Sequence, residues 1–196
     1  MLLISNGTIV GSKGSKQANI LIDGEKIVKI STEDLSFEAG ADAEVIDAAG
    51  KLIFPGFIDA HTHFDLHVAG TVTCDDFASG TKAAVSGGTT MIIDFGTQYP
   101  GETLLEGKEN WDKKAAAGCS SDYSYHMSIT DWNDEARAQC QDMMEEGLST
   151  FKVYMTYDTK LNDEEIYEIL VRLKEVGAFT GCHCENAGMI DTLRKE

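Results

Sequence analysis

The sequence predicts an α/β protein in which a small β-rich unit precedes the first strands of a TIM-like (β/α)8 barrel. Three observations support this fold class. Hairpin signals fill the first fifty residues, apolar stretches alternate with helical patterns after them, and five such stretches fall within about 145 residues. Apolar strands separated by helices indicate a parallel sheet covered by helices. A complete barrel needs roughly 250 residues, so we expect an incomplete one of about five strands.

The first expected domain, residues 1–51, is the β-rich unit. "LLISNGTIV" contains Asn6-Gly7, and "NILIDGEKIVKI" contains Asp23-Gly24. Each dipeptide lies between apolar runs and is typical of a two-residue hairpin turn. We therefore predict a hairpin at each dipeptide, followed by a further strand and turn in "EVIDAAGKLIFPG".

The second expected domain, residues 52–196, holds the barrel strands. The candidates are "LIFPGFIDA" and residues 89–95, 122–130, 150–157 and 178–185. Of the helices between them, 163–176 is the clearest, because its apolar side chains form one stripe. Asn162 is expected to cap this helix, Glu165 to complete a capping box, and Gly177 to end it. Residues 187–196 resemble a sixth helix.

Composition limits the classes of function. The formal charge of -17 argues against nucleic acid and anionic membranes as partners, and leaves a neutral or cationic small substrate open. No stretch approaches the ~18 apolar residues of a membrane span. The five cysteines are odd in number and irregularly spaced, and no secretory signal precedes them. We expect a cytoplasmic protein with reduced thiols.

Unusual polar residues follow or interrupt apolar strands at three positions. His61 and His63 point the same way because strand side chains alternate, and imidazole is the commonest ligand of zinc-like ions. The alternative is a pair of surface-loop histidines. Lys152 lies in the apolar strand "TFKVYMTY", on the face of Tyr154 and Thr156, although burying an ammonium is costly. The alternative is an edge lysine that reaches solvent.

The third is His183 in "CHCEN". Cys182 and Cys184 face away from it in a strand, so the three residues are not expected to share one ion; the cysteines are expected to pack as small apolar residues. A lone core or loop histidine is the alternative for His183. His126, in mid-strand, is interpreted as a core histidine whose hydrogen bonds are satisfied. In a barrel the carboxyl ends of the strands meet at one mouth, which would bring the three unusual positions together.

The motifs "GFIDAHTHFD", "DDFASGTKAAVSGGTTMIIDF", "STFKVYMTY" and "HCEN" resemble those of the cyclic amidohydrolases, closest to the hydantoinases and dihydropyrimidinases. The resemblance implies a barrel with two divalent metal ions, expected to be Zn2+. It implies that His61 and His63 bind the more buried ion and His183 the second. Lys152 would bridge both ions after carboxylation by CO2, and Tyr157 would hydrogen-bond the developing oxyanion.

The implied reaction is hydrolytic ring opening of a hydantoin or dihydropyrimidine by a metal-bridging hydroxide, giving an N-carbamoyl amino acid. The related dihydroorotases hold a substrate carboxylate with an arginine after the two histidines. Asp65 stands in this region here and would repel a carboxylate, which favours an uncharged ring; its alternative role is a structural acceptor. His67 lies in the loop that borders the substrate pocket in the family. The family is typically tetrameric.

The chain also departs from the family pattern. The resemblance calls for a later histidine and a final aspartate, yet all five histidines lie at or before His183. We therefore expect the front portion of a longer enzyme that is inactive alone. The alternatives are a non-catalytic interaction protein of the same fold and an inactive truncated product. Allantoinase and imidase are the alternative activities.

Overall fold

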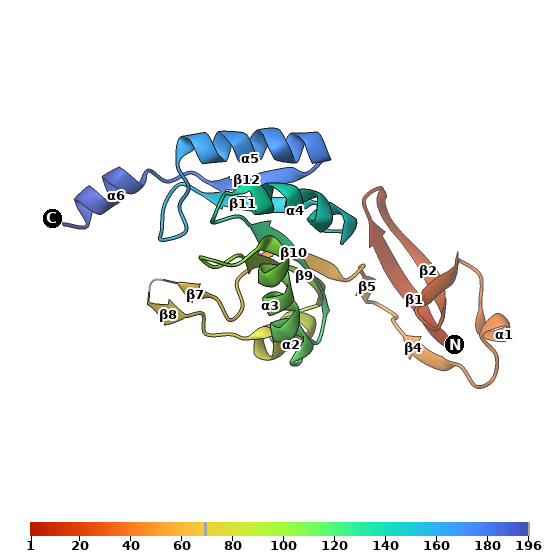
Figure 1. Cartoon of the computed structure of the whole chain (residues 1–196). Coiled ribbons are helices and arrows are strands. Elements are labelled where there is room, and N and C mark those ends of the chain that lie inside the picture. Colours follow the sequence, from red (N-terminus) through yellow and green to blue (C-terminus); the bar gives the residue numbers. More distant parts are fainter. Residues whose placement is uncertain (69, 196) are drawn as a thin grey trace. The chain divides into compact units, whose positions relative to one another are not determined.

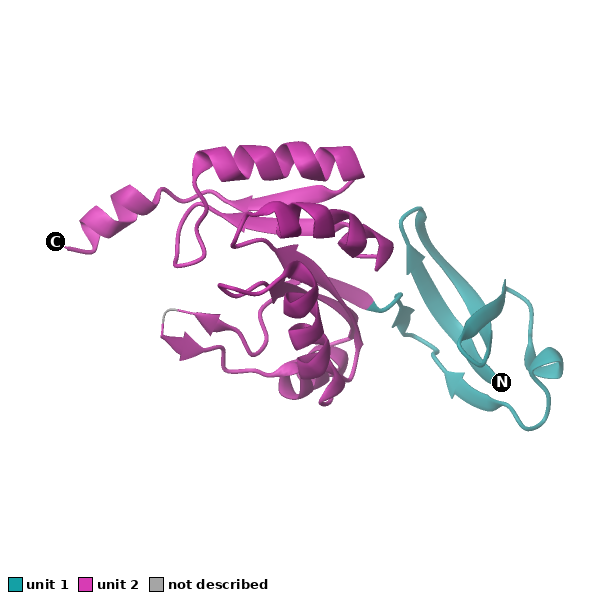
Figure 2. Cartoon of the chain, viewed as in Figure 1, with its two compact units in different colours: residues 1–56 teal, residues 57–196 magenta. Residues whose placement is uncertain are grey.

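The structure is a computed structural model and describes residues 1–68 and 70–195. The chain divides into two compact units, residues 1–56 and 57–196 (Figure 2). The sequence placed the division after residue 51. No helix in the described part of the chain is long and apolar enough to cross a membrane.

The first unit is a five-stranded sheet. Its elements are β1 (Leu2–Gly11), β2 (Gly14–Asp23), β3 (Lys26–Ser31), the short α1 (Ser36–Ala39), β4 (Glu44–Asp47) and β5 (Leu52–Ile53). The strand order is β3-β2-β1-β4, and β5 also pairs with β1. Leu3, Leu21, Leu35 and Ala39 form its small core. The pairing of β5 explains the later boundary, because residues 52 and 53 belong to this sheet rather than to the barrel strand.

One of the two predicted hairpins is confirmed and the other is wrong. β2 turns into β3 at Gly24-Glu25, beside the predicted dipeptide. β1 continues through Asn6-Gly7 and turns only at residues 12–13. The register shifts at Asn6, which has a φ of 62° and donates its side-chain amide to Asp47 at 3.0 Å. A Cβ on Gly7 would lie 2.2 Å from the Ile53 side chain, so this dipeptide forms an irregularity within a strand.

The second unit is a parallel sheet of β6 (Phe57–Thr62), β9 (Thr89–Thr97), β10 (Asp122–Ser128), β11 (Thr150–Tyr154) and β12 (Phe179–His183). The strands lie in chain order, β6-β9-β10-β11-β12. Between them run α2 (Phe77–Ser86), α3 (Leu104–Ala116), α4 (Asp134–Glu145) and α5 (Asp163–Val176), and α6 (Ala187–Leu193) follows β12 (Figure 1). The small hairpin β7 (His67–Val68) and β8 (Thr71–Val72) follows β6. This is the predicted incomplete (β/α)8 arrangement.

The helices cover one face of this sheet. The core between the two layers contains Ile92, Met127, Phe151 and Val153 from the strands, with Trp111 and Leu173 among the helical residues. Phe151 and Val153 lie on the helix side of β11, as the alternation of side chains predicted. Lys152 and Tyr154 therefore lie on the opposite, inner face.

The ends of α5 match the sequence prediction. Asn162 accepts a hydrogen bond from the Glu165 backbone, and the Glu165 carboxylate accepts one from the Asn162 backbone. The helix ends at Gly177, whose φ of 78° lies in the left-handed region that glycine adopts without a Cβ penalty. Local signals of this kind can be read from sequence because all the partners lie within a few residues.

Candidate active site

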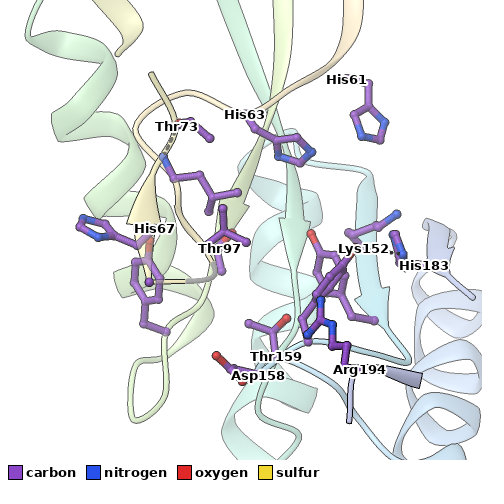
Figure 3. Close-up of a pocket in the computed structure, with 16 residues that line it drawn as sticks. His61, His63, His67, Thr73, Thr97, Lys152, Asp158, Thr159, His183 and Arg194 are labelled. Atoms are coloured by element: carbon purple, nitrogen blue, oxygen red, sulfur yellow. Dashed lines mark hydrogen bonds between the residues drawn. The ribbon is translucent and has the colours of Figure 1, made fainter. Parts of the chain in front are cut away.

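The inner face of the sheet opens at the carboxyl ends of its strands into a cavity of about 520 Å3 (Figure 3). Its lining includes all five residues given metal or catalytic roles above: His61, His63, Lys152, Tyr157 and His183. They come from β6, β11 and β12 or from the segments that follow these strands, although up to 122 positions separate them in the chain (183 minus 61). The parallel order of the strands brings these side chains to one rim.

His61 and His63 extend from the end of β6 on the same side of the strand. Their ring centroids are 5.1 Å apart, and each ring packs against Phe95 of β9, at 4.6 and 4.7 Å. Burial lowers the pKa of the His63 imidazole, which favours the neutral ring. Its Nδ1 is buried and has no hydrogen-bond partner among the described residues. A neutral imidazole with an unused lone pair is the form that binds a metal ion.

Lys152 extends from β11 toward the same cavity. Its ammonium lies 5.6 Å from the centre of the Phe95 ring and 5.4 Å from that of Tyr154. Among the residues that the structure describes, no carboxylate lies within ion-pair distance of it. A charged ammonium on a half-buried side chain without an anion is costly, and addition of CO2 to the amine would convert it into an anion that bound cations could balance.

His183, at the end of β12, is joined to Tyr157 and Glu185. Its Nε2 is 2.6 Å from the Glu185 carboxylate, and the Tyr157 hydroxyl is 3.3 Å from the same nitrogen and 3.4 Å from Glu185. The hydrogen bond with His183 lowers the pKa of the Glu185 carboxyl. Tyr157 has a φ of 70°, a conformation that costs energy and is typical of functional sites.

The side chains at the rim fit a metal centre once Lys152 is modified. In the part of the chain that the structure covers, no group of three His, Cys, Asp or Glu side chains is arranged to hold a metal ion. The two imidazoles at the end of β6 would provide two nitrogen ligands, and a carboxylated Lys152 would add the anionic oxygens that divalent ions bind. The unpartnered Nδ1 of His63 is the observation that supports this fit.

Asp94 is a site residue that the sequence analysis missed. It is fully buried on the helix side of β9, and its carboxylate accepts four hydrogen bonds. Two of these bonds come from the segment that contains His61 and His63: the Thr62 hydroxyl donates at 2.8 Å and the Phe64 backbone N–H at 3.0 Å. The Trp111 indole donates at 3.2 Å, and the Phe95 backbone at 2.8 Å. Burial raises the pKa of Asp94, and these hydrogen bonds oppose part of that rise.

Asp94→Asn is expected to loosen the histidine segment. All four partners of Asp94 are donors, so the amide group of asparagine would face a donor and leave at least one buried group unsatisfied, which costs about 1–3 kcal/mol. We also expect metal affinity to fall roughly 10–100-fold, as it does when outer partners of ligands are removed. Metal titration and denaturant unfolding measure the two effects.

Asp112→Asn is the matched control for Asp94→Asn. Asp112 lies on α3 and accepts from Lys108 at 2.8 Å, and its side chain is partly exposed. We expect this substitution to leave metal affinity unchanged. Equal metal affinities for the Asp94→Asn and Asp112→Asn variants would contradict the role of Asp94 in holding the histidine segment.

The two loop candidates lie in different surroundings. His67 lines the cavity, at some distance from Lys152 and His183 (Figure 3). The Asp65 carboxylate pairs with Lys114 of α3 at 3.6 Å, and the same ammonium donates to the Asp65 carbonyl at 2.8 Å. Lys114 also lies 3.9 Å from the centre of the Trp111 ring. These contacts favour the structural role that the sequence left open for Asp65.

The cysteines beside His183 take separate positions. Cys182 packs against the helix-side core, as expected from strand alternation. The expectation that Cys184 also packs as a small apolar residue is wrong: it follows the last residue of β12, it is exposed, and its thiol donates to the Cys182 carbonyl at 3.4 Å. All five cysteines are free.

The chain is similar to proteins named dihydropyrimidinase and D-hydantoinase over nearly its whole length. The sequence model of the amidohydrolase family matches residues 52–195. A dihydropyrimidinase of Dictyostelium discoideum is 40% identical over 192 residues, which are 96% of this chain and 38% of that protein. A D-hydantoinase of Geobacillus stearothermophilus is 44% identical over 197 residues, covering 99% of this chain and 41% of that protein.

A solved structure gives the same result for the fold. The crystal structure of a dihydropyrimidinase from Brevibacillus agri NCHU1002 matches with a TM-score of 0.92 at 42% sequence identity, over 98% of this chain and 42% of that chain. The predicted barrel fold and family resemblance are confirmed. The chain spans about two fifths of the length of the curated relatives it matches.

Proposed function

This chain belongs to the amidohydrolase family, and from that premise we propose that the whole protein is a metal-dependent hydrolase that opens cyclic amides. The observation that carries the proposal is the meeting of His61, His63, Lys152 and His183 around one cavity. The expected substrates are hydantoins and dihydropyrimidines, and the expected products are N-carbamoyl amino acids. Because the chain covers two fifths of its relatives, we propose that activity requires ligands beyond those present here.

In this proposal the side chains of the chain hold two divalent ions, with zinc as the expected metal. His61 and His63 would bind the more buried ion, and His183 the other. The ions, when bound, lower the pKa of a water molecule and polarise a carbonyl oxygen. Glu185, at 2.6 Å from Nε2 of His183, would have to release that nitrogen or reorient when His183 binds metal.

Lys152 would become a ligand by reaction with CO2. The uncharged Nζ adds to the carbon of CO2, an N–C bond forms, and a proton leaves to solvent, which yields an anionic carbamate. The inner-face position of Lys152 between β10 and β12 supports a bridging role, because β6 and β12 carry the imidazoles on either side. Two bound cations would then compensate the negative charge of the carbamate at this half-buried position.

Tyr157 would donate its phenolic hydrogen to the oxygen that gains charge when water attacks the ring carbonyl. Tyr157→Phe is expected to lower kcat by about 10²–10³-fold, the usual effect of losing one such donor, and to leave metal content unchanged. Tyr167→Phe, at an exposed position on α5, is the control. A Tyr157→Phe variant with the kcat of the unsubstituted protein would contradict this role.

A substrate panel tests the proposed activity. The whole protein, supplied with zinc and bicarbonate, is incubated with hydantoin, dihydrouracil, allantoin and a cyclic imide, and the ring-opened products are quantified. We expect turnover of the first two. Turnover of allantoin or the imide alone would reassign the substrate, and no turnover of any of the four by a metal-loaded protein would contradict the proposal.

We also propose that the protein works as a homotetramer in the cytoplasm. The five free thiols support a reducing compartment, and light scattering measures the assembly. A monomer in light scattering would contradict the tetramer.

A further inference from the structure

The regular hydrogen-bond pattern between β6 and β9 is interrupted at the end of β6, where His61 and His63 lie. β6 pairs in parallel with β9, but the register shifts between Asp59 and Thr62. Side chains make hydrogen bonds to the backbone there: the Asp59 carboxylate accepts from the His61 N–H at 3.1 Å, and the His126 ring bonds the Ala60 carbonyl at 2.9 Å. Register shifts of this kind re-aim side chains next to active sites. The orientation of the His61 and His63 side chains therefore depends on side-chain hydrogen bonds to the backbone of β6, in addition to the pairing of β6 with β9.

His126 uses both nitrogens of its ring. Nε2 lies 2.9 Å from the Ala60 carbonyl oxygen, and Nδ1 lies 2.6 Å from the Thr150 hydroxyl. Because a carbonyl oxygen only accepts, Nε2 must carry a hydrogen, and Nδ1 of the neutral ring then accepts from the Thr150 hydroxyl. The ring is held at both ends by partners on two other strands.

These two hydrogen bonds connect strands that are not neighbours. In the order β12-β11-β10-β9-β6, the ring of His126 on β10 reaches over β9 to β6 and also to the adjacent β11. Ala60 directly precedes His61, and Thr150 lies two residues before Lys152, on the same face of β11. One imidazole therefore links the strand of the histidine pair to the strand of the lysine.

We infer that His126 is a positioning residue that fixes the spacing between the His61–His63 pair and Lys152. The inference rests on the proposed function, because this spacing matters only if the three side chains bind metal together. A second cavity of about 290 Å3 is lined by His61, His126 and Lys152 among others, whereas the described lining of the 520 Å3 cavity includes His61 and Lys152 but not His126. His126 therefore lies beside the candidate ligands and away from the expected substrate. Its role is to hold the strand ends and not to react.

Two amide variants separate the two hydrogen bonds of His126. His126→Gln places an amide near the position of Nε2 and can still donate to Ala60, whereas His126→Asn reaches only the position of Nδ1 and loses that bond. We expect zinc affinity of the asparagine variant to fall roughly 10–100-fold, and that of the glutamine variant, which loses only the bond to Thr150, to fall less. Zinc titration against a chelator measures both, and the melting temperature of the metal-free protein is recorded separately.

Thr150 provides a second test that does not alter the histidine. Thr150→Val keeps the shape but removes the hydroxyl, and is expected to lower zinc affinity; Thr150→Ser keeps the hydroxyl and is expected to preserve it. Tyr125→Phe is the control for the strand, because Tyr125 lies on β10 and is buried in the helix-side core. We expect that variant to bind zinc normally.

The outcomes distinguish this inference from the proposed function. Whole protein that binds no zinc without any substitution would contradict the proposed function itself. Normal zinc binding by the unsubstituted protein, with equal affinities for the asparagine and glutamine variants and for the valine and serine variants, would overturn the positioning role of His126. An affinity loss in Tyr125→Phe equal to that in His126→Asn would also overturn it, because the effect would then be general to the strand.

Discussion

Lys152→Ala is expected to abolish metal bridging and to lower kcat/KM by about 10³-fold or more. A bound metal ion stabilises the transition state by several kcal/mol, and each 1.36 kcal/mol of lost stabilisation lowers the rate tenfold. The reason is specific to this position. Lys152 lies on the inner face of β11, its ammonium has no carboxylate within ion-pair distance among the described residues, and it faces the cavity of the imidazoles. Steady-state kinetics and zinc content of the whole protein measure the effect.

Lys82→Ala is the matched control for Lys152→Ala. Lys82 lies on the exposed side of α2, so the same substitution there does not reach the cavity. We expect this variant to keep its activity and its zinc. If Lys152→Ala retained the activity of Lys82→Ala, Lys152 would have no bridging role.

The substitution of both His61 and His63 by asparagine is expected to have an effect of similar size. Both rings lie at the cavity and pack on Phe95, and the Nδ1 of His63 has no hydrogen-bond partner in the described part of the chain. An asparagine amide is a weak ligand for zinc compared with imidazole, so the more buried ion should be lost. We expect kcat/KM to fall by about 10³-fold or more and zinc content to drop.

His67→Asn is the control for the double variant, with zinc content as its readout. His67 lines the same cavity, at some distance from Lys152 and His183 (Figure 3). The loss of an imidazole there is expected to leave zinc content unchanged. Zinc content that falls equally in both variants would show that the β6 histidines are not specific ligands.

The sequence was sufficient for the features that depend on local pattern. The strand alternation around Lys152 correctly placed Phe151 and Val153 under the helices, and the capping residues of α5 were all predicted, because their partners are close in the chain. Asn6-Gly7 was misread as a hairpin turn. Its conformation depends on partners more than ten residues away, including Asp47, which a local turn signal does not reveal.

Asp94 and His126 were missed as site residues for a related reason. A charged residue in the apolar strand "TTMIIDF" is as unusual as Lys152 in its own strand, and that signal could have identified Asp94. His126 was correctly interpreted as satisfied, but its partners, Ala60 and Thr150, lie on two other strands. Only the folded sheet shows that those partners are next to the candidate ligands.

The most direct test of the proposed metal centre is to measure the mass and the metal content of the intact whole protein, purified with zinc and bicarbonate present. Native mass spectrometry and elemental analysis would be applied to the unsubstituted protein and to Lys152→Ala. We predict two bound ions per chain and the added mass of one CO2 on Lys152, both lost in the alanine variant. An unsubstituted protein with no bound metal and no added mass on Lys152 would contradict the proposed metal centre.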